Sequence, residues 1–315
     1  MNLKFYTGLV HNQWICTLAI GDAYLETYER FVLPFALEYC NRHNFGLVAL
    51  VSDATDSYSP EIASKKKTWQ KLLIPKALMT HLGRDVEVAY YDADILLNPF
   101  GKNIFCHSNK SCLGLTKSSS GLPYDDHLCR RIISFYRNKF YSGSYPLDSA
   151  IFMPTEQLYR YHNFPPYEDY SCLGLFVCHD SSTANKLSEI YQQYDSAIVG
   201  LTEGGDEPFL NYEFRNRFQI YYLDYEFQAL WSWEMASRYR HLFQNPYPTT
   251  ESLNCISSVL LSVTALHFAG SWPDAQLYKD DNLYANVNCT INQQFFNYMQ
   301  TPVWGVPLGR IPSPS

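Results

Sequence analysis

The stretch of residues 86–99 constrains this chain more than any other part of its sequence. Residues 86–91 are rich in β-branched and aromatic side chains, which predicts a buried strand. Asp92 and Asp94 follow at its carboxyl end, where ligands bind in open α/β sheets. Two carboxylates so close together repel each other unless a cation lies between them, and Mg²⁺ and Mn²⁺ prefer oxygen ligands, including phosphate oxygens. The sequence therefore predicts a metal–phosphate site at the end of a core strand.

Length and composition predict an ordinary folded protein. The chain has 315 residues, of which 46% are hydrophobic and 17% charged, enough for one large α/β domain or two modest ones. The formal net charge of −7 argues against a nucleic-acid partner. A diphosphate bound to such an acidic protein needs a local cation, and a metal ion is its simplest source. The many aromatic residues, 16% of the chain, either form core or stack on sugars and nucleobases.

The cysteines and the N-terminus indicate where the protein resides. There are nine cysteines, an odd number, with no CxxC pair, and several lie in apolar runs. This pattern favours a reducing compartment. The N-terminus lacks the apolar segment of a signal peptide, and no stretch approaches the length of a membrane span. We therefore expect a cytoplasmic protein without a transmembrane segment.

Hydrophobic periodicity alternates between the patterns of strands and helices. It predicts a strand, a helix, a strand, a helix and a strand at residues 14–20, 24–39, 45–51, 64–81 and 86–91. This order implies a parallel sheet with right-handed crossovers. Further elements are expected as a strand at 171–177, helices at 182–194 and from 209, and a last strand at 259–268. The prediction is a single α/β domain with a Rossmann-like, mostly parallel central sheet flanked by helices, followed by a proline-rich tail at 301–315.

Five short motifs occur in order between residues 14 and 275. They are Thr68-Trp-Gln-Lys71, Tyr91-Asp-Ala-Asp94, Leu173-Gly-Leu-Phe-Val177, Asp206-Glu-Pro-Phe-Leu-Asn211 and His267-Phe-Ala-Gly-Ser-Trp272. Together they resemble the GT-A fold of nucleotide-sugar glycosyltransferases, and most closely its glycogenin-like and galactinol-synthase-like group. The resemblance implies a GT-A domain over residues 1–300. It also implies a metal-dependent hexosyl- or pentosyltransferase that moves a sugar from a nucleotide donor, UDP before GDP, to a hydroxyl of a glycan or related acceptor.

The resemblance also implies a role for individual residues. Asp92, Asp94 and His267 would hold Mn²⁺ or Mg²⁺, and an imidazole ligand favours manganese. The ion would neutralise charge on the departing nucleoside diphosphate. Asp92 would also touch the donor ribose, and Lys71 the diphosphate or the donor sugar. Two simpler interpretations stay open: Lys71 on a solvated helix face, and His267 as a satisfied core histidine.

Other candidates lie where the first two strands end. Ile20, Gly21 and Tyr24 follow the first strand, at the place where such folds meet the nucleotide. Tyr24 either stacks on the base or belongs to the core. Asp53 ends the second strand and is a candidate hydrogen-bond partner of the base or ribose. Gly174, inside a predicted strand, indicates a close backbone approach.

Asp206 and Glu207 are the candidate catalytic residues, and of the two we expect Asp206 to have the direct role. In an inverting reaction one of them would deprotonate the acceptor hydroxyl as general base. In a retaining reaction the same loop would only orient the two substrates. The group that the chain resembles usually has Asp-Gln here, so the second carboxylate leaves the stereochemistry open. A structural alternative is an acidic first turn that stabilises the helix after it.

Other classes of protein share some of these features. Aspartyl-phosphate phosphatases also place two aspartates after a strand, but they need a small residue or a hydroxyl where this chain has Ile95-Leu-Leu97. A non-catalytic carbohydrate- or nucleotide-binding protein of the same fold remains an alternative. The aromatic segments 141–170 and 231–233 are candidate acceptor surfaces.

Overall fold

The computed structural model describes residues 2–119, 122–141, 149–195, 197 and 206–300. The predicted tail at 301–315 and part of the candidate acceptor segment, residues 142–148, lie outside the described residues. Within the described ranges, no helix is both long enough and apolar enough to cross a membrane.

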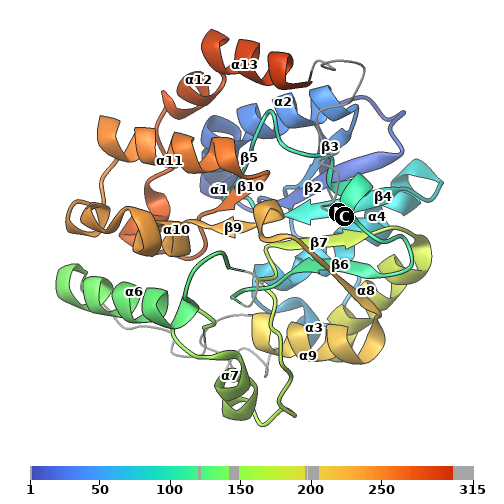
Figure 1. The fold of residues 1–315 in the computed structure, drawn as a ribbon. Coiled ribbons are helices and arrows are strands. Elements are labelled where there is room, and N and C mark those ends of the chain that lie inside the picture. Colours follow the sequence, from blue (N-terminus) through green and yellow to red (C-terminus); the bar gives the residue numbers. More distant parts are fainter. Residues whose placement is uncertain (1, 120–121, 142–148, 196, 198–205, 301–315) are drawn as a thin grey trace, which may run out of the picture.

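Two sheets form the scaffold (Figure 1). A central sheet has seven strands in the order β1-β3-β2-β4-β7-β6-β8, and a small sheet has the order β5-β10-β9. The strands are β1 Leu3–Phe5, β2 Gln13–Leu18, β3 Gly46–Leu50, β4 Glu87–Tyr91, β5 Ile95–Leu97, β6 Leu113–Thr116, β7 Leu175–Cys178, β8 Ile220–Leu223, β9 Ala229–Leu230 and β10 Ala265–His267.

The helices connect these strands. The α-helices are α1 Asp22–Thr27, α2 Leu33–His43, α3 Pro60–Ala63, α4 Ile74–Leu82, α5 Ile104–His107, α6 Asp126–Phe140, α7 Thr155–Tyr161, α8 Ser181–Gln193, α9 Glu207–Arg217, α10 Trp231–Arg238, α11 Thr250–Ser262, α12 Leu283–Val287 and α13 Thr290–Gln300. The remaining helical segments are the π-helical η1 Tyr28–Val32 and the 3₁₀ segments η2 Lys67–Leu73, η4 Tyr225–Phe227, η5 Arg240–Gln244 and η6 Pro273–Gln276.

The α/β fold class is confirmed, but the central sheet is less parallel than expected. β2 is parallel to β3 and β4, and β6 is parallel to β8. Three other pairings, β1–β3, β4–β7 and β6–β7, are antiparallel. β7 lies between β4 and β6 and runs antiparallel to both. Local hydrophobic patterns carry no information about this direction.

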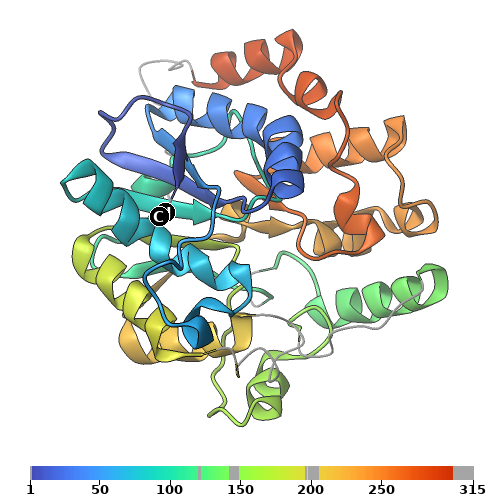
Figure 2. The ribbon, with the colours of Figure 1, turned by 180° about the vertical axis from the view of Figure 1, so that it is seen from behind.

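Helices cover both faces of the central sheet, as Figures 1 and 2 show from opposite sides. Val88 and Tyr90 pack in a core cluster with residues of α4, α8 and α9. Ala89 and Tyr91, which alternate with them, pack with α2 and α5 on the other face. From Val88 to Tyr91, β4 is therefore buried on both faces, and this explains its run of β-branched and aromatic side chains.

Four predicted elements differ from the structure. The predicted strand at 171–177 is wrong over its first four residues, because β7 begins at Leu175. The predicted helix at 64–81 is the 3₁₀ segment η2 over much of its first half and the α-helix α4 only from Ile74. The predicted strand at 259–268 is wrong over its first half: α11 continues to Ser262, and only Ala265–His267 forms a strand. A short apolar run fits a buried helix as well as a strand, and the capping box at Thr249 starts the helix. The predicted helix at 24–39 is divided by the π-helical turn η1, and Pro34 lies in the first turn of α2, where a missing N–H costs little.

Candidate functional site

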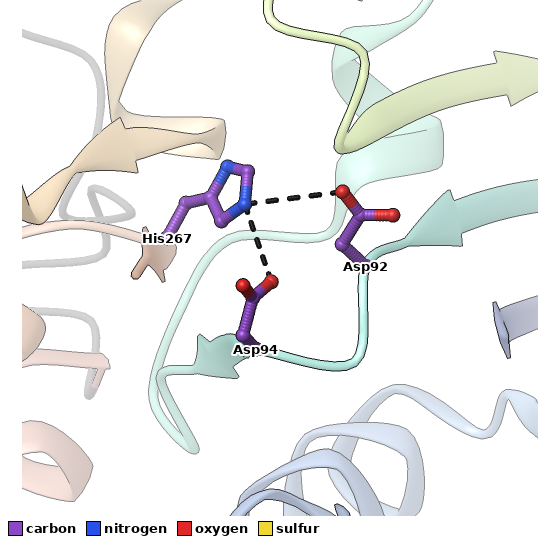
Figure 3. A group of neighbouring side chains, drawn as sticks. All are labelled: Asp92, Asp94 and His267. Carbon is purple, nitrogen blue, oxygen red and sulfur yellow. Dashed lines mark ion pairs between the residues drawn. The ribbon is translucent and has the colours of Figure 1, made fainter. Parts of the chain in front are cut away.

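Backbone pairing brings the three predicted metal ligands together. Asp92 and Asp94 lie in the tight turn between β4 and β5, closed by a hydrogen bond from Ile95 N to Asp92 O of 3.1 Å. β5 pairs antiparallel with β10, with His267 opposite Ile95, and Phe268 N donates to Asp94 O at 3.1 Å. The register of the small sheet thus places the imidazole over the two carboxylates (Figure 3).

The spacing of the three side chains suits a divalent cation. His267 Nε2 lies 3.2 Å from Asp94 Oδ1 and 3.9 Å from Asp92 Oδ2, and one ligand atom from each residue falls within 4.8 Å of the others. An ion with bonds of about 2.1 Å holds adjacent ligand atoms roughly 3 Å apart. Asp94 Oδ1 is buried and accepts no hydrogen bond within the described part of the chain. The three residues therefore fit Mn²⁺ or Mg²⁺.

The charges around Asp92 also favour a bound cation. The Tyr90 hydroxyl donates to Asp92 Oδ1, which leaves Oδ2 facing His267. Burial raises the pKa of Asp92, Lys71 lowers it, and the neighbouring Asp94 raises it again, so that the pKa lies above its ordinary value. A charged carboxylate is thus disfavoured here without further positive charge, and a divalent cation supplies that charge.

Lys71 and Asp206 form a buried ion pair next to this cluster. Lys71 Nζ lies 2.7 Å from Asp206 Oδ2 and donates to Leu173 O at 3.0 Å. Both residues are buried, with 3% and 6% of their surfaces exposed. Burial alone would lower the pKa of Lys71, but Asp206 and Asp92 raise it above its ordinary value, so the ammonium stays charged. The alternative that Lys71 lies on a solvated helix face is wrong.

Asp206 and Glu207 have different surroundings. Asp206 is the N-cap residue of α9, yet its side chain makes no capping hydrogen bond and pairs with Lys71 instead. Glu207 Oε1 accepts a hydrogen bond from Leu173 N at 3.1 Å. Burial, followed by the charge of Asp206, raises the pKa of Glu207 to about 7. Its carboxyl group therefore exists in both protonation states near neutral pH, as a general base requires.

The segment before β7 joins the two halves of the site. Asn211 accepts from Ser171 N at 2.8 Å and donates to Ser171 O at 2.9 Å. Asp92 N donates to Gly174 O at 2.8 Å. A Cβ atom on Gly174 would lie 2.5 Å from His267 Cε1. The close approach predicted for this glycine is confirmed, and the group that approaches it is the candidate metal ligand.

The predicted nucleotide residues occupy the neighbouring strand ends. Ile20 is buried, and Gly21 has φ of 101°, a value that favours glycine. Tyr24 is 71% exposed, so the alternative that it belongs to the core is wrong. Asp53 accepts from Gln70 Nε2 at 2.8 Å and lies 3.5 Å from Lys67 Nζ. These contacts fix Asp53 beside η2, which also carries Lys71.

The two expected acceptor segments differ in exposure. Trp231 and Trp233 are 1% and 0% exposed and belong to the main core, so their segment is not an acceptor surface. They begin α10, whose apolar side packs inward. In the described part of 141–170, Tyr159 and Tyr170 form a small separate core, whereas Tyr161 is 53% exposed.

The sequence did not indicate the residues behind His267. Gln228 Nε2 lies 3.1 Å from His267 Nδ1, and the side-chain amide oxygen of Gln228, Oε1, contacts the Thr116 hydroxyl. Cys172 Sγ lies 3.5 Å from the same imidazole nitrogen. Gln228 stands outside the five motifs, and only the pairing of β9 with β10 brings it to the site.

Comparisons with known proteins give structural similarities only. No protein-family model and no curated protein matches this sequence. A glycosyltransferase involved in glycosylation of the major capsid of PBCV-1 is 11% identical, with a TM-score of 0.47 over 84% of this chain and 98% of its own. The bifunctional glycosyltransferase WbbM is 14% identical, with a TM-score of 0.46 over 91% of this chain and 52% of its own. Mouse xyloside xylosyltransferase 1 is 9% identical, with a TM-score of 0.37 over 81% and 97%. At these values the similarities assign neither a family nor an activity to this chain.

Proposed function

We propose that this chain is a metal-dependent glycosyltransferase of the GT-A type, which transfers a sugar from a nucleoside-diphosphate sugar to a hydroxyl of a glycan or related acceptor. The observation that carries the proposal is the cluster of Asp92, Asp94 and His267, with one ligand atom from each within 4.8 Å of the others, beside a buried and charged Lys71. A cation and an ammonium group at the end of a core strand suit a diphosphate ligand.

Each group then has a distinct task. Asp92, Asp94 and His267 would hold the ion, which, when bound, stabilises charge on the leaving nucleoside diphosphate. Lys71 adds a positive charge next to Asp92, and Asp206 positions its ammonium group at 2.7 Å. Glu207, with a pKa of about 7, is the better suited of the two acidic residues to accept the acceptor's proton in an inverting reaction.

The finer assignments rest on sequence motifs. The resemblance of the motifs at Lys71, Asp94 and His267 favours UDP over GDP as the nucleotide and manganese over magnesium as the metal. The same resemblance favours the glycogenin-like group. A hexosyl or a pentosyl donor fits equally. The cytoplasmic location expected from the cysteine content is part of the same proposal.

A donor-hydrolysis screen tests the proposal. UDP-, GDP- and CMP-sugars are incubated with the protein in Mn²⁺, in Mg²⁺ and in chelator, and release of the nucleotide is measured. We expect metal-dependent release from one donor class, lost in Asp94→Asn and kept in Asp281→Asn, which alters an exposed carboxylate paired with Arg30. Turnover that survives chelation and Asp94→Asn would contradict the proposal. Stabilisation by Mn²⁺ and a nucleoside diphosphate without turnover of any donor would instead indicate the binding protein.

A further inference from the structure

The metal site of the proposed function raises a question about His267. An imidazole binds a metal through a nitrogen that carries no proton, and the nitrogen facing the carboxylates is Nε2. The proton of the neutral ring must then reside on Nδ1, and a buried Nδ1–H needs an acceptor. His267 is 3% exposed, so that acceptor has to come from the protein.

The group best placed at Nδ1 is the side-chain amide of Gln228, 3.1 Å away. Gln228 is 2% exposed, and the other end of its amide contacts the hydroxyl of Thr116, which is 1% exposed. The oxygen and nitrogen of an amide have nearly the same shape, so their assignment follows from the hydrogen bonds around them. A hydroxyl both donates and accepts. Thr116 can therefore accept from the amide nitrogen while the amide oxygen accepts from Nδ1–H.

The backbone holds this arrangement in place. β9 begins directly after Gln228 and runs parallel to β10, with Leu230 opposite His267. Gly174 closes the remaining side, since a Cβ atom there would lie 2.5 Å from His267 Cε1 and 2.7 Å from Gln228 Nε2. The ring and the amide therefore have little freedom to rotate away from each other.

We propose that Gln228, supported by Thr116, is a positioning residue that accepts the Nδ1 proton of His267 and thereby presents Nε2 to the metal ion. It touches neither the ion nor the substrates. The inference rests on the metal site of the proposed function but not on the identity of the reaction. Loss of a hydrogen-bond partner to a metal-bound histidine typically weakens metal binding roughly 10–100-fold.

The test is a titration with Mn²⁺ alone, in which the concentration of free ion is measured by its electron paramagnetic resonance signal. Gln228→Leu removes the acceptor, and we expect its Mn²⁺ affinity to fall roughly 10–100-fold. Gln228→Glu keeps an oxygen at Nδ1 and should retain at least the wild-type affinity. Thr116→Val should weaken binding, by less than Gln228→Leu, whereas Thr116→Ser, which keeps the hydroxyl, should not. Pulsed measurements of ¹⁴N coupling to bound Mn²⁺ should show a weaker imidazole signal in Gln228→Leu than in the wild type.

The outcomes separate this inference from the proposed function. Gln228→Leu and Gln228→Glu with equal Mn²⁺ affinities, whatever their melting temperatures, would overturn the role of Gln228 and leave the metal site standing. If Gln228→Leu fails to fold, an unchanged affinity in Thr116→Val would overturn it. Failure of the wild-type protein to bind Mn²⁺ would overturn the metal site and this inference together. Failure to find a sugar donor, with the affinities as expected, would affect only the proposed function.

Discussion

The buried ion pair between Lys71 and Asp206 gives a quantitative test of how the site is held together. Lys71→Met keeps most of the aliphatic stem and removes the charge. The two groups are 2.7 Å apart, with side chains 4% and 8% exposed, so the substitution leaves a buried carboxylate without its partner. Such a loss costs about 3–5 kcal/mol of unfolding free energy. For a chain of 315 residues this corresponds to a fall in melting temperature of roughly 5–8 °C.

The assay is urea or thermal unfolding of the single variants and of Lys71→Met combined with Asp206→Leu. Replacing both members of a buried pair by apolar groups avoids the unpaired charge, so the double variant should be more stable than Lys71→Met. Arg30→Met, which breaks an exposed pair with Asp281, serves as the control and should leave the midpoint unchanged. A loss below about 1 kcal/mol in Lys71→Met, or a double variant that shows the sum of both single losses, would refute the reasoning.

Three further outcomes are expected. Burial raises the pKa of Glu207 from 4.5 to about 7, so its contribution to stability is complete below pH 4.5 and is lost as the pH rises through 7. In urea unfolding, Glu207→Gln should remove up to about 3 kcal/mol of that decline in the free energy of unfolding. An unchanged pH dependence in the variant would argue against the raised pKa. Gly174→Ala forces a Cβ to within 2.5 Å of the His267 ring and should weaken Mn²⁺ binding roughly tenfold, whereas Gly8→Ala, with no heavy atom within 4 Å, should not. Tyr24→Ala should lower UDP affinity in calorimetry by about 1–3 kcal/mol without changing the melting temperature, because the ring is 71% exposed, and equal affinity would exclude it from the nucleotide site.

Local sequence patterns account for β2, β3 and β4 and for one half of the site. The apolar run at residues 86–91 forms β4, and the next turn delivers Asp92 and Asp94 together. Gly174 directly precedes β7, and a glycine in an apolar run often marks a close backbone approach. These features depend on residues near one another in the chain, so periodicity and turn chemistry suffice to predict them.

The other half of the site depends on contacts between distant residues. His267 reaches Asp94 only because β10 pairs with β5, and Lys71 meets Asp206 across the segment before β7. Resemblance of motifs indicated that these residues belong together, but it did not indicate how they interact. Gln228 carried no local signal at all.

The errors have the same origin. The apolar run from Val259 fits a strand as well as a helix, because short buried helices and strands share a composition. Trp231 and Trp233 were expected at a surface because aromatic residues suit both sugar stacking and cores, and burial depends on the packing of α10. The direction of each strand in the sheet depends on connections between distant residues, and a short stretch of sequence does not reveal it.

A cation held by Asp92, Asp94 and His267 is central to the proposed function, and direct measurement of Mn²⁺ binding tests for it. Titration of the wild-type protein, followed by electron paramagnetic resonance, should show one bound ion. Asp94→Asn and His267→Ala should each weaken that binding by more than the roughly 10–100-fold expected for an outer partner. Wild-type affinity in both variants, or no bound ion in the wild type, would contradict the account.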